Sequence, residues 1–256
     1  MREGGEILGV ILKKTGELIA PQTAADTLEY FVQQEIKKAG ATPAFLNYDT
    51  GYMGKYPAAL CVSLNDEVVH GIPSEKKIFQ EGDIVGIDCG IWYKGLCVDA
   101  ALTVPCGNIR EEANKLLTIT RYALAIAISK CRHGNYVGDI SMAVQRYMDQ
   151  YKFCIIKTLV GHGVGYAVHE EPQIPNFFPF NPKNPRDKGE KLKQGMTLAI
   201  EPMISISSEK TKKGKDGYAA ATSDGSLAAH FEHTIAVTNG KPLILTQYSS
   251  PLTKGG

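Results

Sequence analysis

The chain has 256 residues, of which 43% are hydrophobic, enough for a sizeable core in one or two domains. Its 28 basic and 27 acidic residues give a formal charge of +1, so no overall field favours nucleic acid or anionic membrane as the main target. The apolar run 122–128 is far shorter than the ~20 residues of a membrane span, and residues 1–5 lack a signal-peptide core. The six cysteines show no C-x-x-C spacing and are interpreted as reduced thiols. We therefore expect a cytoplasmic protein that binds neither DNA nor membrane.

The predicted elements follow the same order twice along the chain. Apolar spacing predicts helices over 6–19 and 24–39, followed by strands at 58–64, 84–93 and 96–105. Helices return at 110–130 and 138–151, and strands at 153–160, 196–206 and 230–238. Leu28 and Ile140 fall at matching points of the second helix in each pair, which hints at a duplication with an offset of 112 residues. Since no Pro/Gly/Ser-rich linker separates the halves, residues 1–256 are expected to form a single α+β domain with its site between them.

Four carboxylates fall on strand faces that otherwise carry small residues. Asp88 and Asp99 flank a predicted hairpin turn, and a two-residue loop at Lys94-Gly95 would set Asp99 opposite Gly90. Because side chains alternate along a strand, both acids then share a face as diagonal neighbours. Two later strands repeat the pattern around Glu201 and Glu232. The alternative is a solvated sheet face, but such a face would normally carry Lys, Arg, Ser and Gln as well.

Residues 161–172 hold two of the six histidines, His162 and His169. Three glycines at alternate positions disfavour a helix and allow turns that a Cβ would forbid, so the pattern predicts a shaped loop. Two imidazoles on one loop are typical of a site when other ligating groups converge on it. The alternative is one structural histidine and one exposed one.

Convergence of four carboxylates would raise their pKa values and cost stability, and two divalent cations would compensate. Oxygen ligands with an imidazole suit Co, Mn, Fe, Zn or Ni better than Ca or Mg. Two such ions can share a bridging water, lower its pKa and polarise a carbonyl oxygen, which is hydrolase chemistry.

Together these motifs resemble the type I methionine aminopeptidases of peptidase family M24, and the resemblance covers nearly all of the chain. The motifs that carry it are Asn65-Asp66-Glu67-Val68-Val69-His70-Gly71-Ile72-Pro73, Asp83-Ile84-Val85-Gly86-Ile87-Asp88, Asp99-x-x-x-Thr103, Gly161-His162-Gly163, His169-Glu170-x-Pro172, Ile200-Glu201-Pro202-Met203 and Phe231-Glu232-His233-Thr234. The resemblance implies the pita-bread fold, in which two related α-β halves surround a curved antiparallel sheet.

The resemblance also implies roles for single residues. Metal ligands would be Asp88, Asp99, His162, Glu201 and Glu232, with Asp99 and Glu232 bridging two ions. His70 and His169 would stay unligated and contact the scissile peptide, and Glu201 would move protons. The methionine side chain would lie against His70, Tyr56, Cys61, Val168 and Tyr218. Val168 and Tyr218 stand where many members have Phe and Trp. No role is assigned to His133 or His230, and His233 is expected beside the site or in the core.

The implied activity is removal of the initiator methionine from nascent proteins with a small second residue, by a monomer. Residues 209–217 predict an exposed basic loop, and family members use a basic loop here to dock on the ribosome. The expected contacts with ribosomal RNA are Lys210, Lys212, Lys213 and Lys215, and the alternative is a solvated turn. Two other functions remain open, a peptidase acting on Xaa-Pro bonds and a binding protein that has lost catalysis.

Overall fold

The structure is a computed structural model that describes residues 1–51, 53–179 and 187–248. Its helices are α1 (Arg2–Glu17), α2 (Ala25–Lys38), α3 (Glu111–Ser129) and α4 (Val137–Met148). Its strands are β1 (Thr42–Pro43), β2 (Cys61–Leu64), β3 (Glu67–Val69), β4 (Ile84–Tyr93), β5 (Leu96–Pro105), β6 (Cys154–Ile155), β7 (Val160–Gly163), β8 (Glu170–Pro175), β9 (Thr197–Ile200), β10 (Met203–Ser205), β11 (Thr211–Lys213), β12 (Ala220–Thr222), β13 (Ala228–His230), β14 (Glu232–Ala236) and β15 (Leu243–Ile244).

The four predicted helices are confirmed, with shifted ends. Helix α1 begins at Arg2, earlier than apolar spacing indicates, because its first turn packs through glycines rather than large side chains. A Cβ on Gly5 would lie 2.1 Å from the backbone oxygen of Leu245. Close approach of the two backbones therefore replaces the hydrophobic signal on which the prediction depended.

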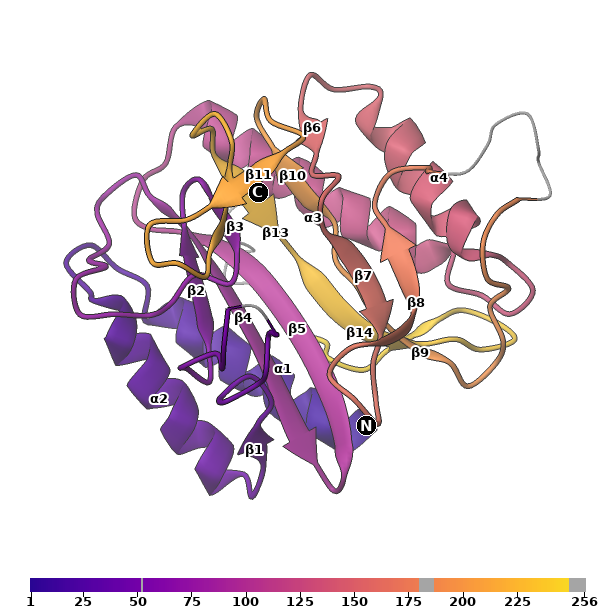
Figure 1. The fold of residues 1–256 in the computed structure, drawn as a ribbon, viewed down its shortest axis with the longest axis horizontal. Helices are drawn as coiled ribbons and strands as arrows, with labels where there is room; N and C mark the ends of the chain where they lie inside the picture. The colour runs from indigo at the N-terminus through magenta and orange to yellow at the C-terminus, as the bar shows by residue number, and fades with distance from the viewer. Residues whose placement is uncertain (52, 180–186, 249–256) are drawn as a thin grey trace.

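A nine-stranded antiparallel sheet forms the centre of the molecule, in the order β1-β4-β5-β14-β9-β7-β8 with β2 beside β4 and β15 beside β14. Helices α1 and α2 lie behind one half of this sheet and α3 and α4 behind the other (Figure 1). The helix pairs cover the same face, which leaves the opposite face for the site. In the described residues no helix is both long and apolar enough to cross a membrane.

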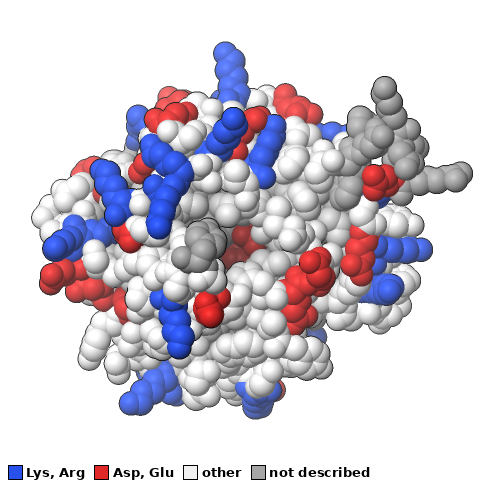
Figure 2. Space-filling view, in the orientation of Figure 1, with Lys and Arg blue, Asp and Glu red and all other residues white. Residues whose placement is uncertain are grey.

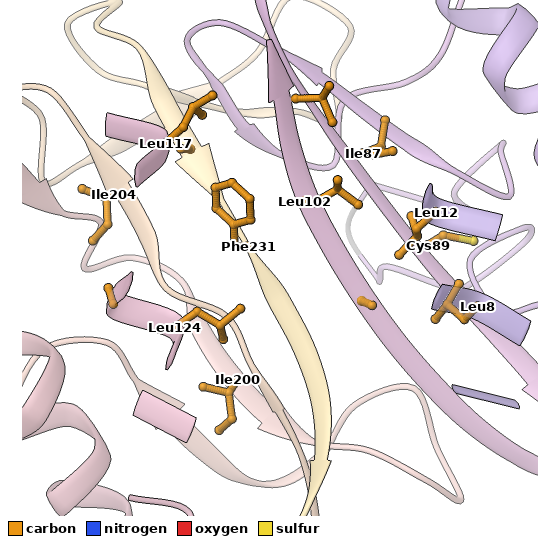
Figure 3. Packing of buried hydrophobic residues seen from close by; sticks show 14 of the residues in the cluster. Leu8, Leu12, Ile87, Cys89, Leu102, Leu117, Leu124, Ile200, Ile204 and Phe231 are labelled. Atoms are coloured by element: carbon orange, nitrogen blue, oxygen red, sulfur yellow. The ribbon is translucent and has the colours of Figure 1, made fainter. Parts of the chain in front are cut away.

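The core fills the space between the helices and the covered face of the sheet. Figure 3 shows Phe231 close to Leu117, while Leu8 and Leu12 of α1 approach Cys89 of β4. Phe231, Leu8 and Leu12 are fully buried. Each fully buried large side chain contributes roughly 1.5–3 kcal/mol by leaving water, so the core holds the strands rigidly in register.

The predicted hairpin of β4 and β5 is confirmed in its register. Asp99 pairs with Gly90, and Asp88 pairs with Ala101 two residues along. Lys94 and Gly95 both have positive φ, as a tight two-residue turn requires. The two carboxylates consequently lie on the same face, as the alternation predicts.

Several predicted segments differ from the structure. The strand expected over 153–160 is reduced to β6, in a three-stranded sheet, and the first residue of β7, in the large sheet. The strand expected over 196–206 divides into β9 and β10, which belong to different sheets, and Glu201 lies between them. Pro202 has no N–H to continue a ladder, so the chain leaves the first sheet at that point. The strand expected over 230–238 likewise divides at Phe231.

The glycine-rich segment differs as well, since His162 lies in strand β7 and not in a loop. The glycines serve close packing here. A Cβ on Gly161 would lie 2.6 Å from the backbone oxygen of Ala199 on the neighbouring strand. The loop is restricted to the connection between β7 and β8, where His169 is found.

Candidate metal centre and substrate cavity

Five side chains converge from five adjacent strands of the large sheet. In sheet order β4-β5-β14-β9-β7, the strands supply Asp88, Asp99, Glu232, Glu201 directly after β9, and His162. Ala101 of β5 pairs with Asp88 on one side and with Glu232 on the other, and its small side chain leaves room between them. Donor atoms of Asp99, His162 and Glu232 all lie within 4.8 Å of one another.

Hydrogen bonds hold two of these residues in place, one from a neighbouring strand and one from within β7. The hydroxyl of Thr234 accepts from the backbone N–H of Asp99 at 2.8 Å and donates to its carbonyl at 2.7 Å. Nδ1 of His162 lies 2.8 Å from the carbonyl oxygen of Gly163. Since a carbonyl oxygen only accepts, Nδ1 carries the proton and Nε2 presents a lone pair. That Nε2 lies 3.3 Å from Oε1 of Glu201.

Burial and mutual repulsion oppose the simultaneous ionisation of the four acids in the cluster. Burial, followed by the charge of Asp99, raises the pKa of Asp88 well above its usual range, and burial raises the pKa of Asp99 to about 7. Burial and the neighbouring acids likewise raise the pKa values of Glu201 and Glu232. Burial lowers the pKa of His162 to about 4, which keeps its imidazole neutral.

The atoms left without partners fit a bound cation. Among the described residues, buried side-chain atoms without a hydrogen bond are Asp88 Oδ1, Asp99 Oδ1, Glu232 Oε1 and His230 Nε2. Buried polar atoms are normally satisfied, so four orphans in one place indicate a missing partner. Carboxylate oxygens and one imidazole lone pair, packed together, are the donor set expected for first-row divalent metals. The five predicted ligands thus fit metal ions.

A cavity of about 360 Å³ opens beside the cluster, with all five predicted ligands in its wall. Figure 2 shows acidic side chains at the bottom of a hollow near the centre of this face, and basic side chains gather above it. The remaining described side chains in its wall come mainly from apolar and aromatic residues, which are Phe45, Tyr48, Met53, Tyr56, Cys61, Val69, Val160, Leu159, Met203 and Tyr218, together with Thr50, Thr158, His70 and His169.

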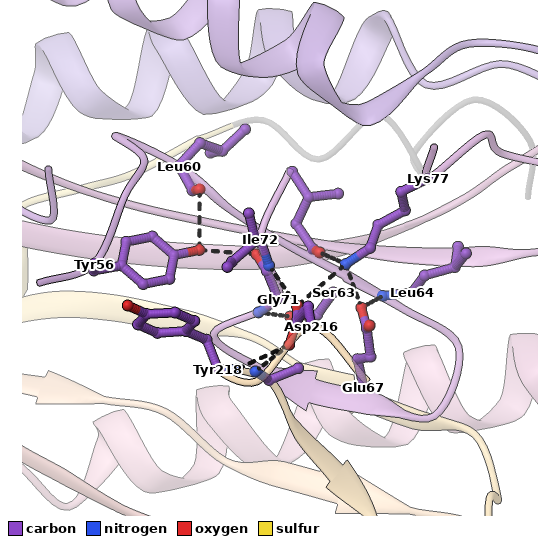
Figure 4. Close-up of polar contacts among 12 residues, drawn as sticks. Tyr56, Leu60, Ser63, Leu64, Glu67, Gly71, Ile72, Lys77, Asp216 and Tyr218 are labelled. Carbon is purple, nitrogen blue, oxygen red and sulfur yellow. Dashed lines mark hydrogen bonds and ion pairs between the residues drawn. The ribbon is translucent and has the colours of Figure 1, made fainter. Parts of the chain in front are cut away.

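His70 lines one side of the cavity, and a polar network holds the residues that follow it. Figure 4 shows this network around Gly71 and Ile72. His70 has φ of +63°, a backbone conformation that non-glycine residues rarely adopt, so its surroundings must hold it there. The next carbonyl, of Gly71, accepts from the Tyr56 hydroxyl at 2.8 Å, and the N–H of Ile72 donates to Asp216 at 2.8 Å. Burial, followed by the charge of His169, lowers the pKa of His70 to about 4.

Lys77 joins that network to the hairpin of β11 and β12. Its ammonium lies 2.7 Å from Glu67 and 3.9 Å from Asp216, and it donates to the carbonyl of Val62 at 2.8 Å. Asp216 also accepts from the N–H of Tyr218 at 2.9 Å. One largely buried cation therefore contacts the carboxylate that accepts from the N–H groups of both Ile72 and Tyr218.

His169 lies at the exposed rim, near His162. Their ring centroids are 4.4 Å apart at an interplanar angle of 65°. Nδ1 of His169 lies 2.7 Å from the hydroxyl of Tyr48, which sets the orientation of the ring. Sequence reasoning missed Tyr48, because 121 residues separate it from His169 and no local pattern connects them.

Of the five predicted pocket residues, Tyr56, Cys61, His70 and Tyr218 line the cavity. Val168 does not lie among its lining residues in the described structure and is instead buried in the apolar cluster behind Tyr56 and Cys61. Phe45 was also missed. A Cβ on Gly90 would lie 2.8 Å from its ring, so the small residue opposite Asp99 makes room for an aromatic wall.

The two histidines on either side of Glu232, His233 and His230, lie in different surroundings. His233 lies in the core on the far side of its strand, 4.5 Å from the Tyr248 ring by centroids and 3.2 Å from the Thr246 hydroxyl. His230, in contrast, lies inside the cluster, where its Nε2 is 3.6 Å from Oε2 of Glu201 and 4.0 Å from Oε2 of Glu232. The alternation of β14 alone could not predict this, since the strand breaks between the two residues.

The four lysines of the predicted basic loop are exposed, but they lie on and beside a hairpin rather than on an irregular loop. Strand β11 pairs with β12, and the Lys212 ammonium donates to the carbonyl of Ser223 at 3.2 Å. The predicted positive surface is present next to the hollow (Figure 2).

Comparisons with known proteins agree with this geometry. The sequence model of metallopeptidase family M24 matches residues 1–239. The chain is 46% identical to a methionine aminopeptidase of Aquifex aeolicus over 248 residues, which cover 96% of this chain and 95% of the relative. It is 40% identical to methionine aminopeptidase 1 of Bacillus subtilis over 247 residues, covering 96% and 95%.

Solved structures extend the comparison to the fold. A methionine aminopeptidase crystal structure from Thermotoga maritima superposes with a TM-score of 0.88 at 42% identity, covering 96% of this chain and 95% of that one. A prolidase from Pyrococcus furiosus superposes with a TM-score of 0.74 at 22% identity, covering 97% of this chain and 63% of that one, which shows likeness of fold alone. The expected pita-bread architecture is confirmed. Given the match over residues 1–239 and the similarity to these relatives, the chain belongs to metallopeptidase family M24.

Proposed function

We propose that the chain is a methionine aminopeptidase that removes the N-terminal methionine from peptides with a small second residue, with residues 1–256 acting as one catalytic domain. The observation that carries the proposal is the convergence of five metal-ligating side chains beside an apolar cavity that also holds two further histidines. Full-length similarity to methionine aminopeptidases supports it.

Membership in a metallopeptidase family implies the use of divalent metal. Two ions would be held by Asp88, Asp99, His162, Glu201 and Glu232. When bound, they supply Lewis acidity and lower the pKa of water to near neutrality. Co, Mn, Fe, Zn or Ni suits this mixture of oxygen and nitrogen donors.

The chain's own side chains would handle protons and hold the peptide. Burial raises the pKa of Glu201, so its carboxylate is suited to accept a proton and return it to the leaving amine. His70 and His169 face the same cavity and would donate N–H groups to the peptide carbonyl as charge develops on its oxygen. Tyr48 would keep the His169 ring in the required orientation.

The apolar part of the cavity would set the specificity. Phe45, Tyr56, Cys61 and Tyr218 offer a wall suited to an unbranched, flexible thioether and unsuited to a charged side chain. Val168 would support this wall from behind.

A metal-reconstitution series tests the proposal. Metal-free protein is loaded with each ion in turn and supplied with Met-Ala-Ser, Met-Lys-Ser and Ala-Pro peptides. We expect metal-dependent release of free methionine from Met-Ala-Ser, with little turnover of the other two. Faster cleavage of Ala-Pro would identify an Xaa-Pro peptidase, and metal binding without turnover of any peptide would identify a binding protein. Equal rates for Met-Lys-Ser and Met-Ala-Ser would contradict the second-residue preference.

We further propose that the enzyme acts as a monomer in the cytoplasm on chains leaving the ribosome. The support is an exposed basic cluster in an otherwise neutral chain, formed by Lys210, Lys212, Lys213 and Lys215. Changing all four to Glu should reduce ribosome co-sedimentation at low salt, because phosphate contacts are lost. Cleavage of free Met-Ala-Ser should be unchanged, and unchanged co-sedimentation would leave only a solvated hairpin.

A further inference from the structure

Among the described residues, four buried side-chain atoms have no hydrogen-bond partner, and only Nε2 of His230 belongs to a residue outside the predicted ligand set. Its side chain is only 4% exposed, and its Nε2 has no hydrogen-bond partner among the described residues. An uncompensated buried imidazole nitrogen costs free energy, so its position requires an explanation.

Backbone pairing fixes where this imidazole is anchored. His230 ends β13 and pairs with Met203 of β10, two residues after Glu201. The hydroxyl of Thr103 holds the His230 backbone on both sides, donating to its carbonyl at 2.9 Å and accepting from its N–H at 3.0 Å. The backbone of His230 is therefore held to β10, which begins two residues after Glu201, and to β5.

The two oxygens of Glu201 face different imidazoles. Oε1 lies 3.3 Å from Nε2 of His162, on the side of the donor atoms that cluster within 4.8 Å. Oε2 lies 3.6 Å from Nε2 of His230. This Glu201 oxygen is the nearer of the two carboxylate oxygens beside His230, since Oε2 of Glu232 lies 4.0 Å from the same Nε2. This placement favours a contact with the carboxylate over direct coordination of a metal ion.

We propose that His230 is a positioning residue, whose Nε2–H donates a hydrogen bond to Oε2 of Glu201 and so directs Oε1 toward the metal centre. Closing the gap to a typical N–H···O distance of about 2.9 Å takes a shift of less than about 1 Å at the end of the Glu201 side chain. Such partners of metal-ligating carboxylates orient the ligand and tune it, and their loss commonly costs about 10–100-fold in metal affinity or activity.

The inference rests on the proposed metal site, and Co²⁺ binding by the full chain tests it separately from peptide turnover. His230→Leu removes the donor at similar volume, whereas His230→Gln keeps an N–H of similar reach. His133→Leu, at an exposed histidine outside the cavity, is the matched control. The readouts are the Co²⁺ dissociation constant from calorimetry, the visible Co²⁺ spectrum, Tm, and kcat and KM for Met-Ala-Ser.

We expect His230→Leu to weaken Co²⁺ binding or lower kcat by about 10–100-fold with KM nearly unchanged. His230→Gln should restore both and keep the wild-type spectrum, since the nitrogen ligand His162 remains. If His230→Leu fails to fold, His230→Asn replaces it, because its shorter amide cannot reach Glu201.

Three results would overturn the inference. Wild-type affinity and kcat in the loss variant would mean that His230 only fills space. A His230→Gln variant as impaired as the loss variant, with a spectrum that has lost a nitrogen donor, would make His230 a metal ligand. Lost activity in His230→Leu with an equal loss in His230→Gln and an unchanged spectrum would indicate a packing role. If the wild-type chain does not bind Co²⁺, the proposed metal site itself fails, which is a different outcome.

Discussion

Replacing Asp99 by Asn should stabilise the metal-free protein. The same change should abolish the activity of the metal-loaded protein. Burial raises the pKa of Asp99 to about 7, against about 3.9 for an unstructured Asp. Because the pKa of Asp99 is higher in the folded than in the unfolded state, ionisation of this group destabilises the folded protein. This destabilisation is absent below about pH 4, grows as pH rises, and is complete above about pH 7. About three pKa units correspond to roughly 4 kcal/mol at pH 8, and a domain of this size gains about 2–4 °C in Tm per kcal/mol. Asn carries no charge, so the variant should melt on the order of 10 °C higher at pH 8.

Differential scanning calorimetry of both metal-free proteins at pH 5 and pH 8 checks the sign and the window. The advantage of Asp99→Asn should be much smaller at pH 5, because native Asp99 is then largely protonated. Added Mn²⁺ or Co²⁺ should stabilise the wild type strongly and the variant weakly. A variant that is no more stable than the wild type at pH 8, or an advantage that is independent of pH, would refute this account of the cluster.

Four further substitutions test metal binding, the positioning network and the shape of the cavity. His162→Ala should weaken metal binding, whereas His169→Ala should keep metal content and lower kcat/KM by about 10²–10³-fold. Equal metal loss in both variants would show that their roles are misassigned. Lys77→Met leaves two half-buried carboxylates without their cation and should cost roughly 3–5 kcal/mol in urea unfolding, and an unchanged midpoint would argue against the network. Gly90→Ala brings a Cβ within 2.8 Å of a ring carbon of Phe45 and should destabilise by about 1–3 kcal/mol and raise KM for Met-Ala-Ser; a wild-type KM would show that Phe45 does not contact the methionine.

The sequence alone determined the features that depend on local pattern. The hairpin register that sets Asp99 opposite Gly90 follows from a two-residue turn and from strand alternation, and the structure has it. The helices follow from apolar periodicity over several turns. The motifs identified the family, and that identification stands on comparisons over nearly the whole chain.

Only the tertiary structure decided how strands distant in sequence lie side by side. The sheet order β4-β5-β14-β9-β7 brings residues from 88 to 232 together, and no local signal encodes that order. Pro202 ends β9 so that Glu201 leaves its strand and meets His230 from another sheet. The pairing of β1 with β4 likewise brings the segment after β1, with Phe45 and Tyr48, to the cavity wall. Non-local pairing is set by the burial of a shared core, and single-sequence patterns report only which face each strand presents.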